Sequence, residues 1–251
     1  MSIFKSVVRK LDPVRVFILE KYYHFLAQRV VRDFDHNLFK DKRVAIIGGA
    51  DSATKDKLGG FIDGFDIVVR INKGVEMVEK YQDYIGQRTD VLFHTFEFRS
   101  GPGSSPVDIE LWHKKGVKYI IFSFNINSRF RWQLFDFVKQ TKGKKDVFQM
   151  DQKSYERNFE VITPFNPTNG FIALNTVFNC SPKELYVTGI TFFKTPHNAD
   201  YRKEDSAVLQ KIIRDGNHSP ETEYRYFKQL YNNNTSIIKP DAILKAILET
   251  N

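Results

Sequence analysis

Short runs of almost continuously apolar residues constrain the fold of this chain most. The runs VAII at 44–47, IVV at 67–69 and YIIF at 119–122 hold no charged residue, and segments with helical periodicity separate them. Strands of this kind are buried on both faces, whereas a strand with one solvated face alternates apolar and polar residues. The pattern therefore predicts an α/β, Rossmann-like fold with a mostly parallel twisted sheet and helices on both faces.

The same patterns place individual elements within residues 41–251, which we interpret as one domain. The strand candidates are Arg43–Ile47, Asp66–Ile71, Asp90–Phe93, Lys118–Phe124 and Glu184–Gly189. The helix candidates are Glu76–Tyr84, Asp108–Lys115, Arg131–Lys139, Gly170–Asn179, Glu221–Tyr231 and Asp241–Leu248. A domain of this length can bury a sizeable core.

Residues 1–40 form a basic segment with the apolar spacing of two amphipathic helices, divided at Pro13. The chain has a net charge of +8, and this segment holds eight Lys and Arg against four Asp and Glu. Two interpretations remain open, because such a helix suits an anionic membrane surface and also packing on the domain or on a partner chain. The basic charge favours the membrane surface.

Composition excludes several classes of protein. No run approaches the roughly 18 apolar residues that cross a bilayer, and the charged N-terminal segment does not resemble a secretory signal. A single cysteine, Cys180, allows neither an internal disulfide nor a cysteine-based zinc site. Arrays of basic and aromatic residues typical of nucleic-acid modules are absent. We therefore expect a cytoplasmic protein that binds no nucleic acid, either free or peripheral on the inner face of the membrane.

Glycines follow the first predicted strand, in Gly48-Gly49-Ala50-Asp51-Ser52. Glycine at this position lets backbone N–H groups approach a phosphate or a ribose. The dinucleotide fingerprint G-x-G-x-x-G and the Walker loop are both absent, so NAD, FAD and a P-loop nucleotide are not indicated. A tight structural turn explains the glycines equally well.

The segments around these glycines resemble a known family. VAIIGG, IDGFDIVVRINKG and YIGQRTD, in this order over about 45 residues, resemble the large sialylmotif of the family 29 sialyltransferases. PTNGFIAL with ELYVTG resembles the small sialylmotif, and His218 to Glu223 has the His-x4-Glu spacing of the very short motif. The resemblance implies a GT-A-like sialyltransferase variant of the Rossmann-like fold. It assigns donor binding to Gly48, Gly49, Asp51, Ser52, Arg70, Asn72, Thr168, Asn169, Gly170 and Glu223.

The chemistry of several of these residues agrees with that assignment. Thr168 or Asn169 can cap a helix at Gly170, whose free N–H groups and positive dipole end attract a phosphate or a sugar carboxylate. Asn72 offers a donor and an acceptor at the end of a strand. Cap and turn roles without a ligand remain the alternative for them.

His218 is the predicted general base. Ser219 can cap a helix with Pro220 at its first position, and the positive helix end then disfavours the imidazolium form of His218. His197 is the second predicted catalytic residue, because the resemblance places it in a short motif built on histidine and an aromatic residue, and it could donate to the departing phosphate. Tyr201 and Arg202 are weaker candidates for the same role. A surface histidine is the alternative for His218.

The chain departs from the family pattern at two places, and the second departure is what a cytoplasmic relative would show. The family's Gly-Asn-Ser turn is Gly48-Gly49-Ala50 here, so the asparagine that would touch the nucleotide is missing. Cys180 stands where Golgi members form a disulfide between the two long motifs, but the partner position is Val44. A microbial or viral member is expected, one that decorates a lipid-linked or surface saccharide such as lipopolysaccharide or capsule.

The expected function is that of an inverting, metal-independent glycosyltransferase. It would move an ulosonic acid, sialic acid or Kdo, from CMP to a saccharide or glycolipid acceptor, with no cofactor and no metal. The D-x-D sequence Asp33-Phe-Asp35 precedes the first predicted strand, where a metal-binding D-x-D does not belong. Two alternatives stay open, namely an α/β enzyme that uses another nucleotide and a basic membrane-surface adaptor without catalysis.

Overall fold

The computed structural model describes residues 13–98, 105–202 and 215–250. Its strands are β1 (Val31–Asp33), β2 (Arg43–Ile47), β3 (Ile67–Ile71), β4 (Val91–His94), β5 (Tyr119–Phe122), β6 (Val147–Gln149), β7 (Glu184–Thr188) and β8 (Ile238–Pro240). Its helices are α2 (Pro13–Val30), α3 (Gly59–Asp63), α4 (Val78–Ile85), α5 (Ile109–Lys114), α6 (Arg131–Gln140), α7 (Gln152–Glu160), α8 (Asn169–Asn179), α10 (Pro220–Asn233) and α11 (Ala242–Glu249). Short 3₁₀ turns follow β1, β2 and β3, at His36–Leu38, Asp51–Thr54 and Asn72–Val75.

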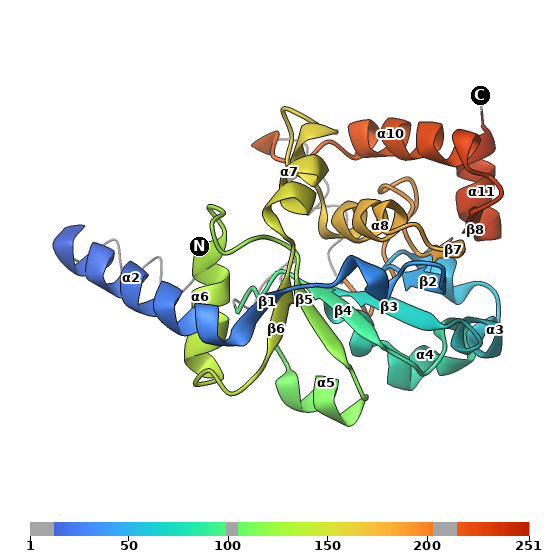
Figure 1. Ribbon diagram of the computed structural model, residues 1–251. Helices are drawn as coiled ribbons and strands as arrows, with labels where there is room; N and C mark the ends of the chain where they lie inside the picture. The colour runs from blue at the N-terminus through green and yellow to red at the C-terminus, as the bar shows by residue number, and fades with distance from the viewer. Residues whose placement is uncertain (1–12, 99–104, 203–214, 251) are drawn as a thin grey trace.

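The eight strands form a single parallel sheet in the order β1-β6-β5-β4-β3-β2-β7-β8. Helices α7, α8 and α10 lie on one face of the sheet and α3, α4 and α5 on the other (Figure 1). The central strands β2, β3 and β4 are almost wholly buried, as their uninterrupted apolar runs predict. The predicted α/β class is confirmed.

The order of the strands indicates where in the sheet a ligand would bind. From β2 the chain winds outward through β3, β4, β5 and β6, and it then returns to add β7 and β8 on the other side of β2. The direction of winding therefore reverses between β2 and β7. In open parallel sheets, ligands bind at such a switch point, outside the carboxyl ends of the two strands.

The N-terminal segment is divided differently from the prediction. Helix α2 extends away from the sheet and packs one side on α6 (Figure 1), with Glu20 paired to Arg131 at 2.8 Å. Strand β1, however, pairs with β6, and Phe34 and Phe39 are buried in the core. The boundary predicted at residue 40 thus falls inside the sheet domain, and the part that stands apart ends near Val30.

The structure describes only part of the N-terminal segment that is predicted to contact a membrane. The first of the two predicted amphipathic helices, before Pro13, lies outside the described residues. Among the helices that the structure describes, none is long and apolar enough to cross a bilayer.

Candidate active site

A cavity of about 110 Å³ lies at the switch point, at the carboxyl ends of β2, β3 and β7. The loop after β2 forms one wall with Gly48 and Gly49, and residues 189–193 after β7 form another. A Cβ on Gly48 would lie 2.2 Å from the carbonyl oxygen of Gly189, and one on Gly49 would lie 2.4 Å from the ring of Tyr201. Both glycines are therefore required for close packing of the walls, whatever the cavity binds.

The N-terminus of α8 opens onto this cavity. Thr168 caps the helix, and its Oγ1 accepts the Phe171 N–H at 3.3 Å. Asn169 donates through Nδ2 to Asn72 Oδ1 at 2.8 Å, while its own Oδ1 is buried and has no hydrogen-bond partner among the described residues. Gly170 also lines the cavity. Side chains from the end of β3 and the start of α8 thus meet at the cavity.

Asn72 faces the cavity because the chain turns there. Strand β3 ends at Ile71, and Asn72 has a left-handed backbone with φ of 48°. Asparagine is one of the few residues that tolerate this region. Its Oδ1 also accepts the Thr95 N–H at 3.3 Å, which joins the ends of β3 and β4.

Glu223 reaches the cavity from α10 and holds the α8 cap. Its carboxylate accepts the Thr168 N–H at 2.6 Å and the Thr168 hydroxyl at 2.8 Å. The side chain is 1% exposed, and this burial raises the pKa of Glu223 to about 8 despite the opposing hydrogen bonds from Thr168. Glu223 therefore connects the small and very short motifs through Thr168.

His218 lies at the start of α10 and is not among the residues that line the cavity. Ser219 caps α10 and Pro220 is its first residue, which confirms the predicted helix start. The His218 Nδ1–H donates to the carbonyl oxygen of Asn166 at 2.7 Å. Because a carbonyl can only accept, Nδ1 carries the proton, and Nε2 of the neutral ring keeps its lone pair. Burial lowers the pKa of His218, and the charge of Arg129 lowers it further.

His197 lies on the cavity wall. Its ring stacks on Tyr201 at 5.7 Å between centroids and meets Phe193 edge-on at 5.2 Å. Its backbone forms an antiparallel bridge with Ala50, which joins this segment to the loop after β2. The Tyr201 hydroxyl donates to the Ile71 carbonyl at 3.2 Å, and burial raises the pKa of Tyr201 to about 12.

Arg70 is a predicted donor contact, but its guanidinium is buried in the core and Arg70 is not among the residues that line the cavity. Its Nη2 donates to the carbonyl oxygens of Ile85 and Gly86, both at 2.8 Å, and its Nε donates to the Thr89 hydroxyl at 2.9 Å. Burial lowers the pKa of Arg70 to about 10, which leaves it charged at neutral pH. Through these hydrogen bonds, Arg70 stabilises the turn between α4 and β4.

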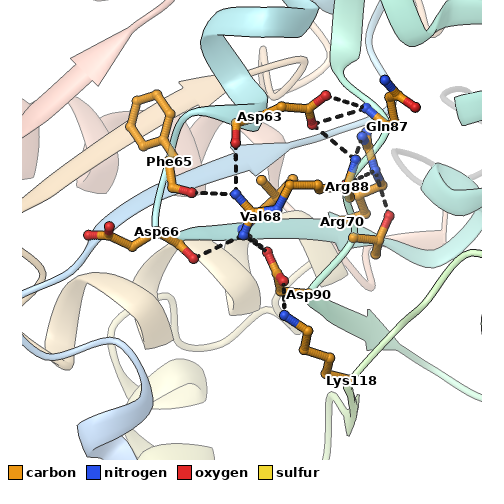
Figure 2. Close-up of polar contacts among 10 residues, drawn as sticks. Asp63, Phe65, Asp66, Val68, Arg70, Gln87, Arg88, Asp90 and Lys118 are labelled. Carbon is orange, nitrogen blue, oxygen red and sulfur yellow. Dashed lines mark hydrogen bonds and ion pairs between the residues drawn. The ribbon is translucent and has the colours of Figure 1, made fainter.

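The G-x-R-T-D sequence before β4 also makes structural hydrogen bonds (Figure 2). The Arg88 guanidinium donates to the carbonyl oxygens of Asp63 and Phe65, both at 2.7 Å, and pairs with Asp90 at 2.8 Å. The Asp63 carboxylate in turn accepts the N–H groups of Gln87 and Arg88. These motif residues join the segment before β3 to the turn before β4.

Asp51 and Ser52 are two further predicted donor contacts that do not line the cavity. Ser52 is buried, and its hydroxyl donates to Asp241 at 3.1 Å. Asp51 pairs with Lys55 at 2.9 Å within the 3₁₀ turn after β2. Both side chains point away because the chain after Ala50 turns into this short helix.

One wall of the cavity had no sequence prediction. Ile190, Thr191, Phe192 and Phe193 follow β7 and line the cavity, and both phenylalanines have positive φ, at 52° and 60°. Left-handed backbone is uncommon for aromatic residues and is found mostly where structure serves a site. The only available signal was the position of this polar and aromatic stretch just after a buried strand.

Within the described ranges, no three His, Cys, Asp or Glu side chains gather as a group of metal ligands. Of the D-x-D pair, Asp33 accepts from Gln149 at 2.9 Å and Asp35 caps the following 3₁₀ turn.

The fold is a parallel α/β sheet whose crevice, with a helix N-terminus, lies at the switch point, where proteins of this class commonly bind anionic groups of nucleotides. Comparison of the sequence with known protein families identifies the family of this chain. The chain belongs to glycosyltransferase family 29, the sialyltransferase family, whose model matches residues 9–235.

Individual relatives are distant. A type 2 lactosamine alpha-2,3-sialyltransferase of Rattus norvegicus is 24% identical over 219 residues, which cover 75% of this chain. The match spans 62% of that relative's length.

Two solved structures share the fold. A mammalian sialyltransferase in complex with Gal-beta-1-3GalNAc-ortho-nitrophenol has a TM-score of 0.57 at 14% identity, over 88% of this chain and 78% of that one. The sialyltransferase CstII from Campylobacter jejuni, in complex with the substrate analogue CMP-3FNeuAc, has a TM-score of 0.52 at 15% identity, over 84% and 89%.

Proposed function

We propose that this protein is an inverting glycosyltransferase that moves an ulosonic acid, sialic acid or Kdo, from its CMP donor to a saccharide or glycolipid acceptor. The observation that carries the proposal is the convergence of motif residues from separate elements on one cavity, namely Asn72, Thr168, Asn169, Gly170 and Glu223. The relatives support the substrate classes, because one was solved with a CMP-sugar analogue and another with a disaccharide glycoside.

The proposed reaction is a single displacement. The acceptor hydroxyl oxygen attacks the anomeric carbon from the face opposite the phosphate, a new C–O bond forms, and CMP leaves with the electron pair of the broken bond. His218 Nε2 takes the hydroxyl proton, since its Nδ1 is already engaged with Asn166. In the proposal, His197 donates a hydrogen bond to the departing phosphate from the cavity wall.

The chain's own groups offset the negative charge that develops on CMP. The N-terminus of α8 presents the backbone N–H groups of Asn169 and Gly170 and a positive dipole end to the cavity. Thr168 and Glu223 hold that helix end in position. We therefore propose that the reaction requires no metal and no further cofactor.

The nucleotide specificity tests this function directly. We expect CMP to raise the melting temperature, and UDP, GDP and NAD to leave it unchanged, in a thermal-shift series at equal nucleotide concentration. Stabilisation by another nucleotide without a response to CMP would support the alternative α/β enzyme. Turnover of CMP-Neu5Ac compared with CMP-Kdo then identifies the sugar.

We also propose that α2 holds the enzyme on an anionic membrane surface, on the cytoplasmic face where a lipid-linked acceptor would be reached. Five apolar side chains of α2 are 54–62% exposed, namely Val14, Phe17, Ile18, Tyr22 and Phe25. Lys21 lies over the Phe17 ring and Arg29 over the Phe25 ring. Apolar rings beside cations are what an interfacial helix requires.

A further inference from the structure

Arg202 is a cavity-lining residue whose guanidinium lacks a full set of hydrogen bonds. It lines the same cavity as the α8 N-terminus. Its Nη1 is shielded from solvent and has no hydrogen-bond partner in the part of the chain that the structure describes. A buried N–H of a charged group is costly to leave unpaired, so native proteins usually provide an acceptor for it.

The position of Arg202 is set by a well-connected turn. The Arg202 N–H donates to the Asn198 carbonyl at 3.0 Å, and the Asn198 N–H donates to the Gly49 carbonyl at 2.9 Å. The Asn198 side chain is buried, and its Nδ2 donates to the Thr54 hydroxyl at 3.2 Å. The Arg202 backbone is therefore joined through Asn198 to the loop after β2, beside the cavity that Arg202 lines.

Two acidic side chains of this region, Asp200 in the same turn and Glu223 at the same cavity, have other partners. The Asp200 carboxylate accepts from Lys80 and from the Tyr81 hydroxyl, both at 2.6 Å. The Glu223 carboxylate accepts twice from Thr168. The acceptor for Arg202 Nη1 is thus expected to come from a ligand in the cavity.

We propose that Arg202 binds an anionic oxygen of the sugar-nucleotide donor, and so contributes to donor specificity. This rests on the proposed function. In a CMP-ulosonic acid, the carboxylate and the phosphate ester oxygen are attached to the same carbon, so two anionic groups lie close together. The cavity has two cationic features to match them, the α8 N-terminus and Arg202. A nucleotide sugar built on an aldose has no carboxylate at that carbon.

Three ligands distinguish the two anionic groups in calorimetric titrations of the full-length protein. Cytidine carries neither anion, CMP carries the phosphate, and CMP-Neu5Ac carries both. We expect Arg202→Gln to weaken CMP-Neu5Ac binding about ten- to hundredfold and to leave cytidine binding unchanged. Weaker CMP binding as well assigns Arg202 to the phosphate, and unchanged CMP binding assigns it to the carboxylate. Arg202→Lys, which keeps the charge but loses the forked geometry, should have an intermediate effect.

Two controls separate ligand binding from folding. Arg225→Gln removes an exposed guanidinium, paired with Glu221 outside the cavity, and should bind all three ligands as the wild type does. Without ligand, Arg202→Gln should melt at the same or a higher temperature, because the unpaired buried N–H is gone. A lower melting temperature with unchanged binding would make Arg202 a structural residue and overturn the inference. A wild type that does not bind CMP would overturn the proposed function and this inference together.

Discussion

At the scale of single residues, His218 combines two properties that a general base needs. Its hydrogen bond to the Asn166 carbonyl fixes the proton on Nδ1, and burial lowers its pKa below the ordinary value of 6.5. The ring is therefore neutral at pH 7, with Nε2 available to accept a proton. Since the base must be unprotonated to act, the acidic limb of kcat/KM against pH should lie below pH 6.5.

Replacing His218 tests its catalytic role. We expect His218→Ala to lower kcat with CMP-Neu5Ac by about 10²- to 10⁴-fold, the range for loss of a general base. CMP binding should persist, because His218 does not line the cavity. Transfer rates and CMP titrations measure the two effects separately. His113→Ala, at an exposed position in α5, should retain full activity, and unchanged turnover in His218→Ala would exclude His218 as the base.

Glu223 makes stability depend on pH in a direction unusual for a carboxyl group. Its pKa is raised from 4.5 to about 8. Between these values the unfolded chain has lost the proton and the folded chain keeps it. The free energy of unfolding therefore falls as pH rises from about 4.5 to about 8, and levels off above that.

Glu223→Gln should remove this dependence. A glutamine can imitate the protonated carboxyl, since its carbonyl accepts the Thr168 N–H and its amide donates to the Thr168 hydroxyl. Relative to the wild type, we expect the variant to gain stability at pH 9 compared with pH 5, as measured by urea unfolding. Glu221→Gln is the control, because the pKa of the exposed Glu221 is lowered by its ion pairs. Parallel pH curves for wild type and Glu223→Gln would contradict the prediction.

The spacing of motif residues could not reveal which side chains face the cavity. Strand alternation puts Arg70 and Asn72 on the same side of a strand. Strand β3 ends at Ile71, however, and the left-handed turn at Asn72 brings only that side chain to the cavity. Arg70 is instead buried in the core, while Arg88 and Asp63 are half-buried near it, and all three bind backbone carbonyls or N–H groups (Figure 2).

At the scale of elements, the apolar runs predicted the central strands to within a few residues. Strand β2 has the predicted bounds, and β3 and β7 differ by one residue. Strands β1, β6 and β8 have three residues each, too few to show a period. Helix α7 escaped prediction because its sequence QKSYERNFE is largely polar, although Asp151 provides a regular cap.

The proposed membrane contact of α2 can be tested by changing its exposed face. Phe17→Ser with Phe25→Ser removes two of its rings, which should abolish flotation with vesicles that contain anionic lipid. Gln28→Ser changes an exposed polar position of the same helix and should float as the wild type does. Binding should also weaken with salt, because Lys21 and Arg29 contribute charge.

Other results would assign α2 differently. Equal flotation of the double variant and the wild type would contradict the membrane proposal. A dimer that dissociates in the double variant, without lipid binding by the wild type, would make this face a protein interface.

At the scale of the whole molecule, the net charge and the sheet topology both suit the proposed anionic donor. The chain carries a net charge of +8, and its sheet directs the carboxyl ends of β2 and β7 and the N-terminus of α8 to one crevice. The lone cysteine has no part in this arrangement. Burial raises the pKa of Cys180 to about 12, so it stays a neutral thiol in the core.

We predict that the reaction proceeds without a metal, which tests whether the α8 N-terminus and the protein's own cations suffice. If the α8 N-terminus and the chain's own cations offset the charge on the departing CMP, chelation should remove nothing that the reaction needs. We expect transfer from CMP-Neu5Ac to proceed at the same rate with excess EDTA as without it, measured as CMP release after exhaustive dialysis against the chelator. A metal-dependent glycosyltransferase assayed in the same buffer should lose its activity and so confirm that chelation is complete. Loss of activity in this protein, with recovery on addition of Mg²⁺ or Mn²⁺, would show instead that a divalent cation carries part of the charge.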